Sequence, residues 1–168
     1  MAEKNQNQAT GDTATGKSDQ VFRIQRMYLK DVSFESPLTP TLFASNTQWK
    51  PEVALHLNTD KTALDNDLFE VVLTLTVTVK SGEETAYLTE LKQAGLFTIK
   101  GFDESTLNGM LYSYCPNILF PFAREAVASL VLKGGFPQLL LEPVNFDALY
   151  AQHVESARQN APAPGTPQ

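Results

Sequence analysis

Two pairs of side chains on predicted strands have the residue types of a contact patch. Asp31 and Glu35 lie four residues apart, and Leu88 and Glu90 lie two residues apart. Side chains at even spacing along an extended strand point to the same face, so Leu88 and Glu90 would share a face, and so would Asp31 and Glu35 if the extended conformation continues to Glu35. Together the pairs would place carboxylates beside an apolar side chain on one sheet surface. Leu88 could equally be an isolated exposed leucine, which is common on protein surfaces.

Other residue types that often carry chemistry have simpler explanations here. The sequence contains no glycine-rich phosphate loop, no HExxH, no CxxC and no Gly-x-Ser-x-Gly. Cys115 lies beside Pro116 in an apolar stretch, which favours a small core residue over a nucleophile. His56 and His153 are far apart in the sequence, and lone histidines are weak indicators of catalysis. We therefore expect no enzyme, no cofactor and no metal site.

Composition bounds the class of protein and its partners. The chain has 168 residues, of which 42% are apolar, enough for one domain with its own core. Its net charge of -6 argues against nucleic acid or an anionic membrane as the main partner and favours a basic one. One cysteine, no secretory signal at the start, and no apolar run near the ~18 residues of a membrane span predict a soluble cytoplasmic protein.

Alternating apolar and polar residues predict four strands between two polar tails. We expect disordered tails at 1–20 and 160–168 and one domain over 21–159. The strands are predicted at 21–31, 52–58, 68–79 and 85–100, with a hairpin turn at 81–83 and a turn-rich segment at 59–67. Phe22, Ile24 and Tyr28 share the buried parity of the first strand, and Gly95 favours a bulge or bend in the last.

Three helices are predicted after the strands. Asp103 or Ser105 would cap a short helix, and Asn145 would cap the last one. Between them, residues 114–133 form the main helix, with Pro116 in its first turn and Gly134-Gly135 as its stop. Strands followed by helices predict an α+β fold, a four-stranded antiparallel sheet with helices packed on one face. The apolar stripe of the main helix is wider than one small sheet needs, so that helix should lie between layers.

Several long blocks, in this order, closely resemble the SecB family of bacterial protein-export chaperones. They are residues 22–28 (FRIQRMY), 30–35 (KDVSFE), 49–51 (WKP), 114–125 (YCPNILFPFARE) and 136–149 (FPQLLLEPVNFDAL). The resemblance covers about 22–150. It implies a homotetramer, a dimer of dimers, in which the long helices lie between outer four-stranded sheets. The family is a holdase that needs no ATP, keeps unfolded precursor proteins translocation-competent and delivers them to the SecA motor.

The resemblance also implies roles for particular residues. An acidic patch in the family receives the small, basic, zinc-bearing C-terminal segment of SecA, so the zinc belongs to the partner. The matching positions here are Asp31, Glu35, Leu88 and Glu90. Unfolded clients bind apolar grooves beneath the loop between the first two strands, whose lining would be Phe43, Trp49, Leu55, Leu57, Tyr150 and Val154. The expected subunit interface comprises Thr89, Leu91, Ile118, Phe122, Val127 and Leu130.

Two of these inferences leave alternatives open. Val53, Leu55 and Leu57 could equally be plain core residues of a strand rather than groove lining. The chain could also be a regulatory binding module, because SecB-like proteins can serve as dedicated partners of toxin–antitoxin pairs. An adjacent toxin–antitoxin operon would favour that second hypothesis.

Overall fold

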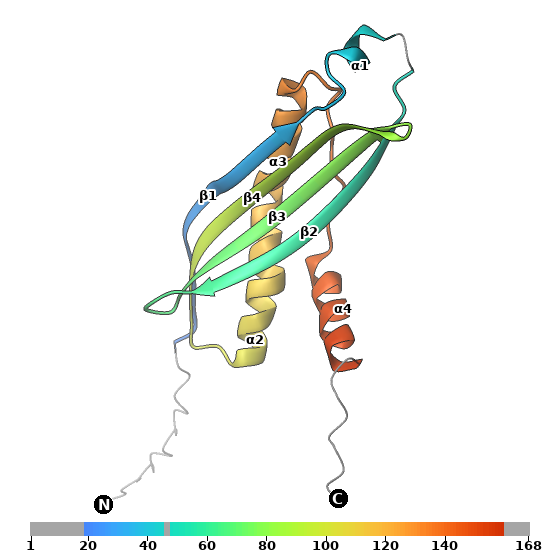
Figure 1. Ribbon diagram of the computed structural model, residues 1–168. Helices are drawn as coiled ribbons and strands as arrows, with labels where there is room; N and C mark the ends of the chain where they lie inside the picture. The colour runs from blue at the N-terminus through green and yellow to red at the C-terminus, as the bar shows by residue number, and fades with distance from the viewer. Residues whose placement is uncertain (1–18, 46–47, 160–168) are drawn as a thin grey trace, which may run out of the picture.

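The computed structural model describes residues 19–45 and 48–159 as one antiparallel sheet with helices (Figure 1). The strands are β1 (Val21–Glu35), β2 (Pro51–Ala63), β3 (Leu68–Ser81) and β4 (Glu84–Lys100), in the spatial order β1-β4-β3-β2. The predicted tails lie outside the described residues, apart from positions 19 and 20.

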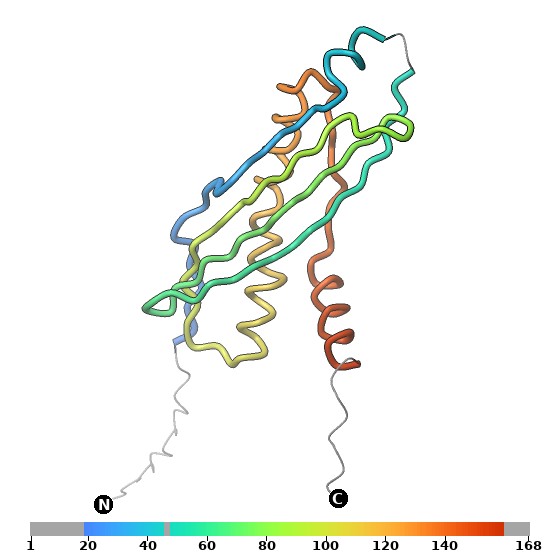
Figure 2. Tube along the Cα trace, viewed as in Figure 1, coloured from blue at the N-terminus to red at the C-terminus, as the bar shows by residue number. Residues whose placement is uncertain are grey.

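The helices are α1 (Thr41–Ala44), α2 (Glu104–Gly109), the π-helical turn η1 (Met110–Tyr114), α3 (Cys115–Lys133) and α4 (Phe146–Gln159). In Figure 1, α3 passes behind the sheet, α2 lies below it, and α4 lies beside α3 past the edge formed by β2. Figure 2 shows α1 beyond one end of the sheet, in the connection from β1 to β2. The predicted α+β fold is therefore confirmed for the single chain.

β2 is longer than its sequence pattern suggested. It pairs with β3 from Pro51 to Ala63, so the prediction that 59–67 is turn-rich was wrong. The reversal occupies only 64–67, where Asn66 and Asp67 adopt positive φ angles of 62° and 58°. Asn and Asp tolerate this left-handed conformation better than most residues, so two of them suffice for the turn. The other predicted hairpin is confirmed, since Gly82 and Glu83 alone join β3 to β4.

Two bulges change the faces to which β1 side chains point. The register with β4 shifts between Ile24 and Arg26 and again between Leu29 and Asp31. Each extra residue reverses the alternation, so Tyr28 lies on the face opposite Phe22. The prediction that Tyr28 is buried with Phe22 was therefore wrong, and Tyr28 instead bonds to a side chain on the outer face.

The predicted short helix and main helix form one continuous helix, Glu104–Lys133. Asp103 caps its start by accepting a hydrogen bond from the Thr106 N–H at 3.0 Å. Pro116 was expected in the first turn but lies inside, directly after the wide turn η1. A π turn gives the proline ring room against the carbonyl four residues earlier, because it widens the backbone there. By length and hydropathy this helix could cross a membrane, but core helices of soluble proteins meet the same test.

The other predicted helix ends are confirmed. After α3, the Phe136 N–H donates to the Val131 carbonyl and the Gly135 N–H donates to the Leu132 carbonyl. Gly135 has a φ of 83°, so the pair forms a Schellman stop. At α4, the Asn145 side chain accepts from the Ala148 N–H at 3.0 Å.

The core lies between the inner face of the sheet and one side of α3. Alternate residues of β3, Val71 to Val79, have no exposed surface, and neither have Leu119, Ala123 and Val127 of α3. Gly95 of β4 belongs to this layer. A Cβ there would lie 2.6 Å from the Phe97 ring and 3.1 Å from Leu119. Gly95 lets the helix approach the sheet. The predicted bulge is not at Gly95: β1 has two bulges, and the one register shift of β4 against β3 falls at Ala86.

Gly95→Ala should therefore destabilise the fold. Overpacking a dense core costs about 1–3 kcal/mol, because the Phe97 ring must leave its position. Urea unfolding measures the change. Gly109→Ala is the matched control, since a Cβ at Gly109 meets no atom closer than 3.9 Å and alanine favours a helix. Equal stability of the two variants would contradict this account of Gly95.

Candidate functional site

The outer face of the sheet, opposite the helices, carries the predicted acidic patch. The pairing of β1 with β4 sets Glu35 against Leu88, Ser33 against Glu90, and Asp31 against Lys92. The structure thus places Asp31, Glu35, Leu88 and Glu90 on one face of two neighbouring strands, as the spacing predicted. The bulge before Asp31 is what brings it to this face. We call these four residues the acidic patch.

The acidic patch also contains a cation, Lys92, which was not among the predicted site residues. Lys92 Nζ lies 3.7 Å from the Asp31 carboxylate and 3.5 Å from the Glu90 carboxylate. Glu90 also accepts a long hydrogen bond of 3.4 Å from the Thr76 hydroxyl on β3. The Asp31 side chain is 64% exposed and that of Glu90 42%, so both remain open to a partner.

A second charged group lies further along the same face. Lys30 Nζ donates to both carboxylate oxygens of Glu70, at 2.8 and 2.7 Å, and the Tyr28 hydroxyl donates to the same carboxylate. The hydrogen bond from Lys30, then that from Tyr28, lowers the pKa of Glu70. Burial and the carboxylate raise the pKa of Tyr28 to about 12. This tight arrangement ties β1 to β3 across β4.

Acid should loosen that tie. A carboxyl group whose pKa is lowered by folding contributes stability that is present above its unfolded pKa of about 4.5 and is lost as the pH falls through the folded pKa. As the pH falls below about 4.5, wild-type protein should therefore lose stability more steeply than Glu70→Gln. Urea midpoints across that range test this. Parallel curves for the two proteins would contradict a role for Glu70.

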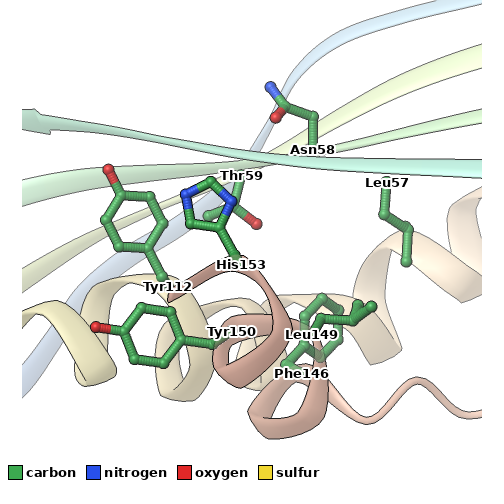
Figure 3. Close-up of a pocket in the computed structure, with 8 residues that line it drawn as sticks. All are labelled: Leu57, Asn58, Thr59, Tyr112, Phe146, Leu149, Tyr150 and His153. Atoms are coloured by element: carbon green, nitrogen blue, oxygen red, sulfur yellow. The ribbon is translucent and has the colours of Figure 1, made fainter. Parts of the chain in front are cut away.

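The inner face carries an apolar pocket between β2 and α4 (Figure 3). It encloses about 220 Å³, and Leu57 points from β2 toward α4 whereas Asn58 points to the other side. Among the described helices, none packs on Val53 and Leu55 of β2 as α3 packs on β3, and these two residues remain 46% and 37% exposed. The pocket is lined by Leu57, Asn58, Thr59, Tyr112, Phe146, Leu149, Tyr150 and His153.

The pocket continues along α4. An adjoining hollow shares Tyr112, Tyr150 and His153 and extends to Val154. Tyr112 and Tyr150 stack with ring centroids 6.2 Å apart, and the Lys61 ammonium lies 5.2 Å from the centre of the Tyr112 ring. Together the two hollows form an open groove lined by apolar side chains and by polar ones such as Lys61 and Arg158. We call them the α4 groove.

Near α1 a second apolar surface is built around Phe136. The rings of Phe43, Trp49 and Tyr87 lie 5.0, 5.7 and 4.6 Å from its centroid. Phe136 is buried, whereas Phe43 is 53% exposed. An added Cβ at Gly135 would lie 3.3 Å from the Phe43 ring, so this glycine lets α1 approach the end of α3. We call Phe43, Trp49, Tyr87 and Phe136 the aromatic cluster.

The six predicted groove residues thus fall into two places. Leu57, Tyr150 and Val154 line the α4 groove, Leu55 lies beside it on β2, and Phe43 and Trp49 belong to the aromatic cluster. Leu55 and Leu57 are not fully buried core. The sequence analysis missed Tyr112, because it precedes the expected start of the main helix. Its stacking on Tyr150 joins η1 to α4, and spacing along the sequence gives no signal for that contact.

Three of the six predicted interface residues lie inside the single chain. Thr89, Leu91 and Val127 have no exposed surface in the single chain. Thr89 donates a hydrogen bond to the Ser33 carbonyl, and the other two fill the core under α3. They therefore cannot offer a side chain to a second subunit. Ile118 and Leu130 are half-buried and Phe122 is 48% exposed, so only these three stay available.

Residues considered for catalysis are not arranged for it. Cys115 is fully buried, and burial raises the pKa of its thiol to about 12, which confirms the core residue. His56 lies on β2 and His153 on α4, and His153 lines the groove. Within residues 19–45 and 48–159, no group of three His, Cys, Asp or Glu side chains could hold a metal ion.

Comparison with known proteins gives a consistent result. The family model for preprotein translocase subunit SecB matches residues 15–157. The protein-export protein SecB of Nitrosococcus oceani is 53% identical over 163 residues, 97% of each chain. Its namesake from Methylococcus capsulatus is 56% identical over 146 residues, 87% of this chain and 92% of its own.

A solved structure shares the fold. It is the SecB-like chaperone of Mycobacterium tuberculosis, in complex with a peptide from the HigA1 antitoxin. It is 19% identical, has a TM-score of 0.62, and the match covers 73% of this chain and 90% of that one. The family match, the relatives above 50% identity and the shared fold agree, and this chain belongs to the SecB family.

Proposed function

We propose that this chain is an ATP-independent holdase that binds unfolded precursor proteins, keeps them competent for translocation and delivers them to SecA. The observation that carries the proposal is the α4 groove, with apolar side chains left exposed along β2 and α4. Its relatives are named protein-export proteins, which fits this role. The proposed protein is not an enzyme and needs no cofactor.

The chemistry of the groove suits unfolded clients. Apolar burial contributes roughly 25 cal/mol per Å² whatever the sequence of the client, so one groove can hold many segments. Folded proteins keep their apolar side chains inside and offer little to it. The exposed Phe43 extends the same kind of surface toward the aromatic cluster. Clients long enough to cover both surfaces would gain affinity from each.

Delivery to SecA would use the acidic patch on the opposite face. Carboxylates steer a basic segment toward the sheet, and Leu88 offers it an apolar contact that charge alone cannot provide. The partner's zinc-bearing C-terminal segment fits this description. Because the acidic patch and the α4 groove lie on opposite faces of the sheet, both could be occupied at once.

The proposed assembly is a homotetramer, a dimer of dimers, in the cytoplasm. Exposed apolar side chains on β1 and α3 support it, since Leu29, Phe122 and Leu132 are each about half exposed in the single chain. Surfaces of this kind usually mark contacts between subunits. The proposed partners are further copies of this chain, unfolded precursors and SecA. We propose that the protein neither binds nucleic acid nor inserts into the membrane.

The direct test of the holdase is aggregation of a denatured precursor, followed by light scattering, with and without the chain. Suppression at stoichiometric amounts without nucleotide is the expected result. Unchanged aggregation, or suppression that requires ATP, would refute the proposal. A regulatory role with a toxin–antitoxin pair finds no support in the relatives above 50% identity, which are named for export.

A further inference from the structure

The cation inside the acidic patch has a consequence for the partner. We infer that Lys92 competes with the basic segment of the partner for the patch carboxylates, and so restricts binding to strongly basic segments. This inference rests on the proposed role of the acidic patch in SecA binding. It concerns how that site is regulated and which partners it accepts.

The two contacts of Lys92 are weak by geometry. Charge-assisted hydrogen bonds of lysine to a carboxylate are usually 2.7–2.9 Å long. Lys92 Nζ lies at 3.7 and 3.5 Å from Asp31 and Glu90, and in the described chain no hydrogen bond joins it to either. The Lys30–Glu70 pair on the same face, at 2.7 and 2.8 Å, shows what a tight pair looks like. Lys92 therefore lies between two carboxylates without being held by either.

This position makes Lys92 a competitor rather than a structural cation. Its ammonium cancels one of the three negative charges that Asp31, Glu35 and Glu90 supply. A binding segment must either displace Lys92 or accept its repulsion, and both lower the affinity. Only a segment with several cations can outcompete one lysine, whereas a segment with a single cation gains little. The preferred partner is then a short basic segment with an apolar side chain for Leu88.

The test is Lys92→Gln, with the purified C-terminal zinc-bearing segment of SecA as the probe. The variant should bind roughly two- to fivefold more tightly at low salt, because two weak exposed ion pairs no longer compete. The gain should shrink as salt is added, since the contacts are exposed to solvent. Titration calorimetry at two salt concentrations measures both.

Two control variants separate a general charge effect from a specific effect of Lys92, and test whether the acidic patch is the binding site. Lys100→Gln changes the net charge equally, and Lys100 is an exposed lysine at the far end of β4 that forms no ion pair with any described residue. Equal gains in both variants would show a general charge effect and overturn the inference. Glu90→Gln should weaken binding. If Glu90→Gln weakens binding but Lys92→Gln does not strengthen it, the acidic patch remains the binding site and only the inference about Lys92 fails. If Glu90→Gln changes nothing, the acidic patch is not the site and both proposals fall.

Discussion

Leu55→Asp with Leu57→Asp should reduce affinity for an unfolded precursor by roughly ten- to a hundredfold, the largest effect we expect. Both residues point to the inner face of β2, where they pair with Val77 and Leu75. Burying a leucine is worth about 1.5–3 kcal/mol, and two carboxylates in the groove would have to be desolvated as well. Fluorescence anisotropy of a labelled, denatured precursor measures the loss.

We expect the variant to remain folded, since β2 is an edge strand on which Leu55 is 37% exposed and Leu57 is only half-buried. Circular dichroism and unchanged affinity for the SecA segment would establish that. Leu64→Asp is the matched control, because Leu64 is 46% exposed and lies in the turn after β2, outside the groove. Normal client binding by the folded double variant would show that the α4 groove is not where clients bind.

The second large effect should come from Glu90→Lys. Reversing the central charge of the acidic patch replaces an attraction with a repulsion and places a second lysine beside Lys92. We expect the affinity for the SecA segment to fall at least about tenfold at low salt, with client binding unchanged. Calorimetry with the segment, and anisotropy with a denatured precursor, measure the two properties separately.

Glu83→Lys controls for net charge, since Glu83 lies in the exposed hairpin loop between β3 and β4. It should leave SecA binding within about twofold of wild type, because a solvated charge beyond the Debye length of ~8–10 Å acts weakly. A Glu90→Lys protein that still binds the SecA segment with wild-type affinity would remove the acidic patch from the account. Loss of client binding in the same protein would mean that the two faces are not independent.

The sequence predicted local structure well where one signal decided it. The alternation of β3 gave its buried face, and Asp103, Asn145 and Gly135 marked helix ends through hydrogen bonds that the structure contains. Prediction from the sequence failed where a structural feature depends on two strands together. The bulges of β1 depend on its pairing with β4, so the reversal at Tyr28 is invisible in the strand alone.

The binding surfaces were predictable to different degrees. The acidic patch needed only side-chain parity and the resemblance to known relatives, and the register of β1 with β4 supports it. The α4 groove joins β2, η1 and α4, which are distant in sequence, so Tyr112 and Lys61 could not be anticipated from spacing. The burial of Thr89 and Leu91 in the single chain could not be predicted for a similar reason, because parity gives the face but not what covers it.

The central claim is that the inner face of the sheet, with the α4 groove, holds unfolded chains while the outer face, with the acidic patch, receives SecA. Size-exclusion chromatography with light scattering on one sample tests it most directly, first for the chain alone, then with a denatured precursor, then with the SecA segment added. We predict a tetramer whose mass grows by the precursor, and grows again by the segment without loss of precursor. A monomer that ignores the precursor, or a segment that expels it, would contradict the claim.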